Sequence, residues 1–591
     1  MSYRWFLWAA LMEAACASGA STTGGSPSTS GGTSGSNGVS SSGEAGMAGR
    51  GGSSGSSGSS EVDASAGGSS DARSAGSSIP SDDAASSGSG SSGTGSSSGS
   101  SGPPKGKYDW LQFEFSQDKM GIDTAETTVN ASNVAMLTQL FQVALPDAPD
   151  GAPVALSGVA TPMGVKDLVF VQGQHGLLTA FDGTTGTVVW KADFTSPNYG
   201  NSAPAIDPNR QYIYVNTSEG FIHKVHVTDG TEVKATPWPT STGKGGKASG
   251  QLAIGTDNTG TSYLYATNNG QGRLTTVNLA TGSTHVFNFA CSQYPDTQNP
   301  PTCDQGANPW ARSPVFLPDL QRVYVGTGTN AGSGQFTAGK IWRTSWVALP
   351  PDGHTTMMGG LGYPVDSYTV TNWSMIVGAD IDTAVGGLIP IPSGYSSKYP
   401  HLALQPGKDQ NVRLLNTADL SGQGGPGHLG GELAVAHIGL GLMRSWGTIW
   451  INPATKAAWF YVGMGLHGPG GIASFTIDLD ATGNPTLTPH WINKNGWTTA
   501  PFIANGVLYA TNNAGDTTNA NKPHLIQALD PATGNLLWSA MVGPHHWSSP
   551  IMVNGILYLG DGDSGGCDLA TANPNCTPAG TNGHLTAWSL K

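Results

Sequence analysis

Residues 179–190 read TAFDGTTGTVVW, and residues 527–538 read QALDPATGNLLW. Both stretches hold Ala, Asp, Thr, Gly and Trp at the same internal spacing, so the chain contains one phrase twice. Each copy combines an apolar strand, a tight turn closed by a Thr-Gly pair and a second apolar strand ending in Trp, which predicts an antiparallel hairpin with one buried face. Self-similarity of this kind indicates an architecture of repeated modules.

Looser copies of this phrase lie between the two, and a second phrase, a Pro-led strand followed by Tyr, precedes most of them. Together the phrases predict four short strands per unit of about 40 to 50 residues, the period of a propeller blade. The sequence therefore predicts an all-β fold, a β-propeller of four-stranded antiparallel blades, with eight blades favoured and seven as the alternative. The blades are expected near residues 154–196, 200–240, 250–290, 310–350, 376–420, 444–492, 497–543 and 545–591.

The two ends of the repeat region complement each other. The last copy, GHLTAWSLK at 583–591, supplies the strand with Ala587 but lacks the partner strand that ends in Trp. That partner is expected in LTQLFQVAL at 137–145, where Phe141 occupies the Trp position. Because joining these strands in one blade removes two open sheet edges, we expect the N-terminal strand to close the ring.

The N-terminus has the pattern of an export signal. One basic residue precedes a short apolar stretch, WFLWAALM, and small residues follow it. This pattern predicts a signal peptide over residues 1–17 rather than a membrane span of about 20 residues. Cys16 resembles the lipid-attachment cysteine of bacterial lipoproteins, whereas cleavage after Ala17 would release a secreted protein. We expect an exported chain, either held in the cell envelope (outer membrane or periplasm) through a lipid on Cys16 or secreted.

Composition separates a tether from a folded domain. Residues 18–106 are almost wholly Ser, Gly, Ala and Thr, with no apolar run that could offset the entropy of ordering the chain, which predicts a disordered Gly/Ser-rich tether. The propeller is expected over residues 107–591. The formal net charge is −13 and no run of Lys or Arg occurs, which argues against a nucleic-acid partner. The expected partners are a protein or polymer bound through the propeller loops, and a membrane reached through the lipid.

The remaining four cysteines form two locally spaced pairs, Cys291 with Cys303 and Cys567 with Cys576. Both pairs span loops rich in Pro, Asn and Asp. In an exported protein this spacing predicts disulfides, each contributing about 3 kcal/mol by the chain-entropy account. A metal site is the alternative, but the chain has no C-x-x-C and no His at zinc spacing from these cysteines.

The A-x-D-x-x-T-G-x-x-x-W phrase resembles the repeat of the pyrroloquinoline quinone (PQQ) propellers, the superfamily of quinoprotein alcohol dehydrogenases and their non-catalytic relatives. The resemblance covers residues 108–591 and includes the stretch before the closing strand, where a Trp and a Gly-x-x-x-x-Glu-Thr motif occur. It implies the propeller fold. It leaves the function open, because the same repeats occur in enzymes and in scaffolds that bind no quinone.

Three places resemble parts of the quinoprotein site. Trp310 and Asn330 stand, by resemblance, where the enzymes place a Trp that stacks on the quinone and an Asn that touches calcium and quinone. Lys408 resembles the Lys that polarises the quinone carbonyl. Asp380 and Asp382 resemble the stretch that contributes the catalytic base. The other interpretation of Lys408 and the two Asp is a turn lysine and solvated loop carboxylates.

The departures from the enzyme pattern favour a scaffold. Asn330 is displaced by one position, which would turn its side chain to the wrong face of the strand. Neither a vicinal Cys-Cys pair nor a C-x-x-C-H haem motif occurs, and the Glu that would complete the calcium site has no clear counterpart. The sequence thus favours an exported binding or scaffold module with no certain cofactor. The alternative is a PQQ- and calcium-dependent dehydrogenase that oxidises an alcohol or a sugar.

Overall fold

The computed structural model describes residues 102–591 except for fourteen segments or single residues: 196–199, 244–249, 299, 301–307, 310–311, 330–334, 377–380, 440, 444, 465–469, 495–496, 514–523, 546 and 563–582. The expected signal peptide, Cys16 and almost all of the expected tether therefore lie outside the described residues. Among the described residues, no helix has the length and apolar character needed to span a membrane.

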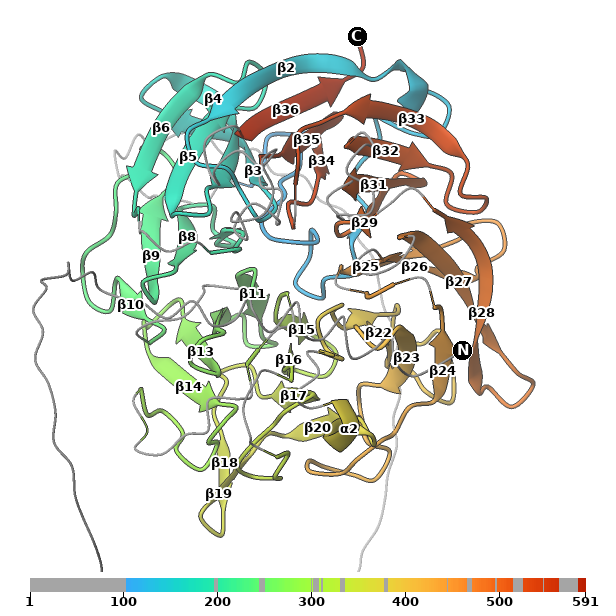
Figure 1. Ribbon diagram of the computed structural model, residues 1–591. Helices are drawn as coiled ribbons and strands as arrows, with labels where there is room; N and C mark the ends of the chain where they lie inside the picture. The colour runs from blue at the N-terminus through green and yellow to red at the C-terminus, as the bar shows by residue number, and fades with distance from the viewer. Residues whose placement is uncertain are drawn as a thin grey trace, which may run out of the picture. The chain divides into compact units, whose positions relative to one another are not determined.

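Eight four-stranded antiparallel sheets stand radially around one axis (Figure 1). From the innermost strand outward, blade one consists of β3 (Val154–Thr161), β4 (Gly164–Gln172), β5 (Leu177–Asp182) and β6 (Val188–Asp193), and blade two of β7 (Ala205–Ile206), β8 (Tyr212–Thr217), β9 (Phe221–His226) and β10 (Thr240–Ser241). Blade three consists of β11 (Ala253–Thr256), β12 (Ser262–Asn268), β13 (Arg273–Asn278) and β14 (Thr284–Asn288), and blade four of β15 (Val315–Leu317), β16 (Arg322–Gly326), β17 (Ser345–Leu349) and β20 (Asp366–Thr369).

Blades five to eight follow the same order. They are β21 (Ile389–Pro390), β22 (Leu402–Pro406), β23 (Asn411–Asn416), β24 (Ala434–His437); β25 (Gly447–Ile451), β26 (Ala458–Met464), β27 (Gly471–Leu479), β28 (Pro485–Asn493); β30 (Phe502–Ala504), β31 (Val507–Asn513), β32 (Leu525–Leu529), β33 (Leu536–Met541); and β34 (Ile551–Val553), β35 (Ile556–Gly560), β36 (Gly583–Ser589), β2 (Thr138–Leu145). Blade seven gains β1 (Ile122–Asp123), parallel to β30, and β29 (Trp497–Thr498), which pairs with β31.

The N-terminal strand closes the ring, as the sequence predicts. Strand β2 is the outermost strand of blade eight and pairs antiparallel with β36. Phe141 lies opposite Ala587, just as Trp190 lies opposite Ala180 within blade one. The closing strand therefore supplies the residue at the Trp position that the last repeat lacks. The predicted count of eight blades is confirmed.

The repeated Trp and Gly contact each other across neighbouring blades. Gly230, in the turn of blade two, has φ +76°, and a Cβ built there would lie 2.6 Å from the ring of Trp190 in blade one. Trp190 also donates its Nε1 hydrogen to the carbonyl oxygen of Val227 at 3.0 Å. At the closure, Phe141 approaches Gly186 of blade one in the same way, with 2.7 Å to a built Cβ. The phrase therefore encodes the packing between blades as well as the hairpin.

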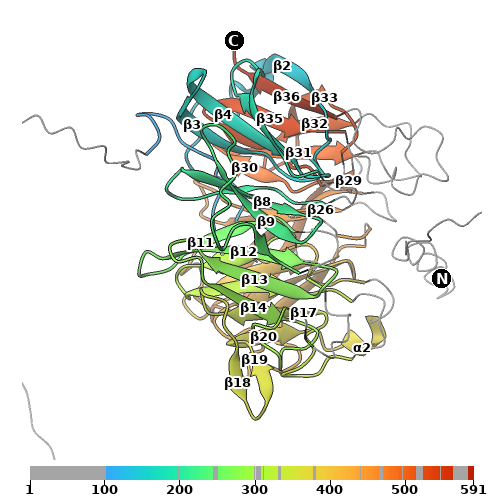
Figure 2. The ribbon, with the colours of Figure 1, turned by 90° about the vertical axis from the view of Figure 1, so that its left-hand side faces the viewer.

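Blades four and five extend further along the chain than the sequence predicts. In blade four, the hairpin β18 (Thr356–Met358) and β19 (Leu361–Tyr363) is inserted before the outer strand β20, so that the blade ends at 369 rather than near 350. The hairpin projects from the ring beside β14 and β20 (Figures 1 and 2). In blade five, the outer strand β24 follows a long loop and ends at 437 rather than near 420. A short helix, α2 (Trp373–Ile376), and a 3-10 turn, η2 (Val134–Met136), complete the described elements.

Residues 108–126, here called the lead-in segment, cross the inner strands at the axis and form the blue trace at the centre of Figure 1. The segment contacts seven of the eight blades, in pairs that include Trp110 with Ala155, Leu111 with Ile206, Gln112 with Ile254, Gln117 with Phe316, Met120 with Ile449, Gly121 with Ile503 and Tyr108 with Asn554. Strand β2 thus closes the ring at its rim, and the lead-in segment ties the inner strands together.

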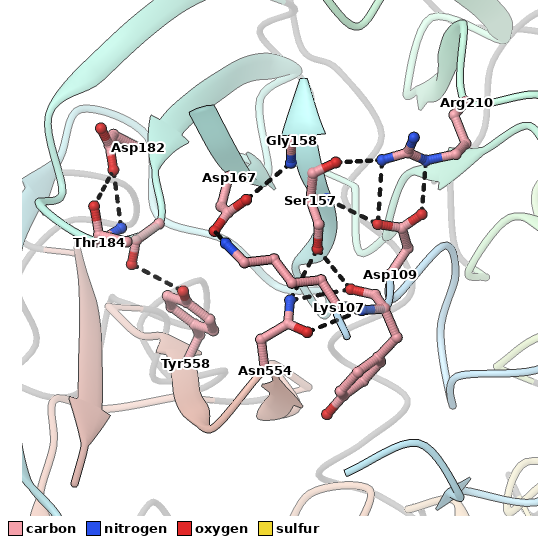
Figure 3. A network of polar contacts seen from close by, with 12 residues as sticks. Lys107, Asp109, Ser157, Gly158, Asp167, Asp182, Thr184, Arg210, Asn554 and Tyr558 are labelled. Carbon is pink, nitrogen blue, oxygen red and sulfur yellow. Dashed lines mark hydrogen bonds and ion pairs between the residues drawn. The ribbon is translucent and has the colours of Figure 1, made fainter. Parts of the chain in front are cut away.

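A polar network fixes the start of the lead-in segment (Figure 3). Lys107 forms an ion pair with Asp167 of blade one. Asp109 accepts a hydrogen bond at 2.7 Å from the Nε of Arg210, which lies in blade two. The backbone N–H of Tyr108 donates to Asn554 Oδ1 of blade eight at 2.9 Å. These contacts hold three blades to one short stretch of chain.

Candidate functional site

Asp382 and Lys408 lie at the same end of blade five. Asp382 belongs to the segment before the inner strand β21, and Lys408 belongs to the turn between the second and third strands, β22 and β23. Because neighbouring strands of a blade are antiparallel, the start of the first strand and the turn between the second and third strands share one end of the sheet. The resemblance placed these two residues in one site, and the topology brings them together.

The two side chains form a buried ion pair. Lys408 Nζ lies 2.6 Å from Asp382 Oδ2, with side-chain exposures of 6% and 0%. The other carboxylate oxygen, Oδ1, accepts hydrogen bonds from Thr329 N at 2.6 Å and from Thr329 Oγ1 at 3.1 Å. Asp382 therefore links blade four to blade five. The interpretation of Asp382 as a solvated loop carboxylate is wrong, because its side chain is fully buried, whereas Lys408 does lie in a hairpin turn.

Close backbone packing holds the Lys408 turn in place. Gly407 approaches the segment that carries Asp382, and a Cβ built on Gly407 would lie 2.8 Å from the carbonyl oxygen of Thr383. Gln410 takes a left-handed φ of +62° and donates its N–H to the carbonyl oxygen of Gly407 at 3.0 Å. A residue with a side chain at 407 would push the turn away, so the Gly is needed for the ion pair to form.

Three of the expected site residues, Trp310, Asn330 and Asp380, lie outside the described residues, so their roles stay predictions. The sequence reasoning missed Thr329, which binds Asp382 through both its N–H and its hydroxyl. A signal was present, because Thr329 is the residue that follows Gly328 where the enzymes have Asn.

Asp382 is the described residue that the resemblance assigns as a catalytic base, and protein groups surround its carboxylate. A catalytic base needs a carboxylate oxygen that can accept a proton from the substrate. Both oxygens of Asp382 are already engaged, by Thr329 and by Lys408, in a fully buried position. Within the described part of the chain, no group of three or more His, Cys, Asp or Glu side chains is placed to hold a metal ion.

A second cluster of buried charges occupies the axis. Arg312, which precedes the inner strand of blade four, donates from Nη2 to the carbonyl oxygen of Trp547, which precedes the inner strand of blade eight, at 2.6 Å. Its guanidinium carbon lies 5.3 Å from the Trp547 ring centroid and 5.8 Å from that of Phe113. Burial raises the pKa of Glu114 well above its usual range, against the attraction of Arg312 and Lys119. Burial also lowers the pKa of Lys119 to about 7.

Of the four cysteines expected to form disulfides, the structure describes one. Cys291 is buried, with 1% exposure, directly after blade three. Cys303, Cys567 and Cys576 lie outside the described residues. The pairings Cys291 with Cys303 and Cys567 with Cys576 therefore stay predictions.

Comparisons with known proteins support the propeller assignment. Residues 121–295 match the family described as outer membrane protein assembly factor BamB. The quinohemoprotein alcohol dehydrogenase from Comamonas testosteroni is similar in structure, with 15% identity and a TM-score of 0.52 over 82% of this chain and 80% of that one. A europium-containing methanol dehydrogenase has 13% identity and a TM-score of 0.53 over 82% of this chain and 98% of its own. BamB from Moraxella catarrhalis has 13% identity and a TM-score of 0.43 over 77% of this chain and 98% of its own.

No curated protein matches the chain in sequence. Because the solved structures share only 13–15% sequence identity with this chain, their similarity shows the fold alone. The BamB match begins at residue 121, near the end of the lead-in segment, and covers the first three blades, and five more blades of the same four-stranded design complete the ring. The chain is therefore an eight-bladed β-propeller, and residues 121–295 of it match the family described as outer membrane protein assembly factor BamB.

Proposed function

We propose that this chain is an exported binding or scaffold module of the cell envelope, which presents the loops of a rigid propeller to a protein or polymer partner. The observation that supports it most directly is the state of Asp382, the described residue closest to a catalytic role. Its carboxylate is fully buried and accepts from Thr329 on one oxygen while facing Lys408 with the other. In this arrangement Asp382 is bound to Thr329 of blade four and ion-paired with Lys408 of blade five, and its carboxylate is closed off from solvent.

The same contacts argue against an electrostatic role for Lys408 in catalysis. An ammonium group that stabilises negative charge on a reacting oxygen acts best when no fixed anion neutralises it in the ground state. Lys408 already faces the Asp382 carboxylate at 2.6 Å. The ion pair would have to open before either group could serve a substrate.

The envelope location rests on the sequence and on the family match. The N-terminal pattern predicts export, and Cys16 is the proposed point of lipid attachment. The matching family is described as outer membrane protein assembly factor BamB, which is the reason for proposing an envelope protein as the partner. Changing Cys16 to Ser should move the chain from the membrane fraction to the soluble fraction of fractionated cells, and an unchanged distribution would contradict anchoring by lipid.

A second candidate function is a PQQ- and calcium-dependent dehydrogenase of an alcohol or sugar. The observation in its favour is that Lys408 and Asp382, which resemble the carbonyl-polarising Lys and the catalytic base, do meet at one end of blade five. In this candidate, Trp310 would stack on the quinone and Asn330 would contact calcium and quinone, with Asp380 as an alternative base.

One experiment separates the two candidates. The purified mature chain is incubated with PQQ and calcium, passed through gel filtration and assayed for quinone absorbance and for dye-linked oxidation of a panel of alcohols and sugars. The scaffold proposal predicts no retained quinone and no oxidation. Retention that Lys408→Ala or Trp310→Ala abolishes, and that Lys398→Ala at an exposed lysine leaves unchanged, would establish the dehydrogenase instead.

A further inference from the structure

Two histidine–aspartate pairs face each other on the outside of blades three and four. His285, on the outer strand β14, has Nδ1 3.2 Å from Asp296 Oδ1. His354, in the loop after β17, has Nδ1 2.6 Å from Asp352 Oδ1. The two imidazole centroids are 6.4 Å apart, and their planes meet at 63°. The His side chains are 37% and 49% exposed, so solvent ions reach both rings.

Backbone hydrogen bonds hold each carboxylate in place. Asp296 donates its N–H to the carbonyl oxygen of Val286 at 2.9 Å, and its Oδ1 accepts the Val286 N–H at 2.8 Å. Asp352 Oδ1 also accepts the backbone N–H of His354 at 3.2 Å. The outer strand of blade three thus anchors the carboxylate of Asp296, and the backbone of His354 anchors that of Asp352.

The loop that carries His354 is fastened onto blade three. The hydroxyl of Tyr265 donates to the carbonyl oxygen of Pro351 at 2.6 Å. Gly353, at φ +74°, packs so closely on Thr276 that a Cβ would collide with it. Thr276 is the register partner of His285 across β13 and β14. The packing of Gly353 on this strand pair thus brings the next residue, His354, beside His285.

The arrangement of nitrogens suits a metal ion. An imidazole that donates its Nδ1 hydrogen to a carboxylate keeps the Nε2 lone pair available, and this is the usual support for a metal-binding histidine. Neutral imidazoles prefer zinc, copper and nickel over calcium and magnesium. We propose that His285 and His354 bind one divalent transition-metal ion through their Nε2 atoms, with Asp296 and Asp352 as the carboxylates that orient the rings.

The spacing of the rings fits this proposal. With a metal–nitrogen bond of about 2.1 Å and a ring nitrogen about 1.1 Å from its centroid, two imidazoles on one ion have centroids at most about 6.4 Å apart. The observed 6.4 Å is at this limit. Tetrahedral coordination would draw the rings about 1 Å closer, a movement that two half-exposed side chains can make. Water completes the coordination, which makes the ion exchangeable.

The test is metal titration of the purified chain without a histidine tag. Isothermal calorimetry with zinc, nickel and copper chlorides should show one saturable site, with copper bound more tightly than nickel or zinc and no binding of calcium or magnesium. His285→Ala and His354→Ala should each abolish the site. Asp352→Asn should weaken it by about 10-fold or more, because the ring loses its orienting carboxylate.

Two variants are matched controls. His437 is exposed and contacts the amide oxygen of Asn411 rather than a carboxylate, so His437→Ala should leave the titration unchanged. His524 and His545 form another close histidine pair, with centroids 6.0 Å apart, and His524→Ala should also leave the titration unchanged. The proposal is overturned if the wild-type chain binds none of the three metals, if His285→Ala retains full affinity, or if His524→Ala removes the site.

Discussion

Replacing Asp382 by Asn should destabilise the propeller strongly. The Asn keeps a carbonyl oxygen for the two hydrogen bonds from Thr329, so the loss arises almost entirely from the charge. Lys408, 5% exposed, would then face a neutral amide at the place where the carboxylate lies 2.6 Å away in the wild type. Removing one member of a buried ion pair costs about 3–5 kcal/mol, because the remaining charge stays desolvated.

A double-mutant cycle measures this directly. The wild type, Asp382→Asn, Lys408→Met and the double variant are unfolded in urea and followed by tryptophan fluorescence, and the free energies of unfolding are compared. We expect each single change to lose about 3–5 kcal/mol, and the double variant to lose less than either, since it buries no lone charge. Lys398→Met, at an exposed lysine, should stay within about 0.5 kcal/mol of the wild type.

Two outcomes would refute the reasoning. A loss below about 1 kcal/mol for Asp382→Asn is typical of exposed ion pairs and would mean that the pair contributes little to the stability of the propeller. Additive losses in the double variant would mean that the two residues act separately. Either result would make Asp382 available for chemistry and would favour the dehydrogenase candidate.

Three further predictions concern the ring itself. A chain that begins after β2 loses the lead-in segment as well as the closing strand and leaves β36 as an open edge, and we expect it to aggregate in size-exclusion chromatography while the intact chain elutes as a discrete peak. Gly230→Ala places a methyl group 2.6 Å from the Trp190 ring at a φ of +76°, and thermal unfolding should show a loss of at least about 1–2 kcal/mol, which an unchanged melting temperature would contradict. Burial raises the pKa of Asp123, which shares the Tyr108 hydroxyl with Glu126, from 3.8 to about 6. A carboxyl group whose pKa is raised in the folded state stabilises the fold fully below pH 3.8, and this contribution is lost as the pH rises through 6. The free energy of unfolding of Asp123→Asn should therefore rise by up to about 3 kcal/mol relative to that of the wild type between pH 4 and pH 8. Parallel curves of stability against pH for the two proteins would contradict this prediction.

Most of the architecture could be predicted because it is encoded by neighbouring residues. The Thr-Gly turn and the Trp that follows it set the hairpin, and the same Gly and Trp set the contact between blades, as Gly230 and Trp190 show. Phe141 could be assigned to the closing strand because the final repeat lacked only that position. The outer strands of blades four and five could not be placed, since an inserted hairpin in one and a long loop in the other displace them from the repeat period.

The candidate site, too, could be predicted from the sequence only in part. The resemblance selected Asp382 and Lys408, and antiparallel topology predicts that the two segments share an end of the blade. The topology of a single blade could not predict that Thr329 would bind one carboxylate oxygen of Asp382, because that contact joins two different blades. The axial position of Arg312 against Trp547 was equally hidden, since it depends on the curvature of the closed ring.

By itself, the sequence determined the all-β repeat and the strand that closes the ring, and it favoured eight blades over seven, because hairpin turns and strand alternation depend on residues only a few positions apart. Only the tertiary structure decided how the lead-in segment crosses the inner strands, how Asp382 is satisfied and how His285 meets His354. These contacts join residues that are distant in sequence, and their free energies depend on burial and on the mutual orientation of blades. Burial at these positions and the mutual orientation of the blades are set only when the ring closes.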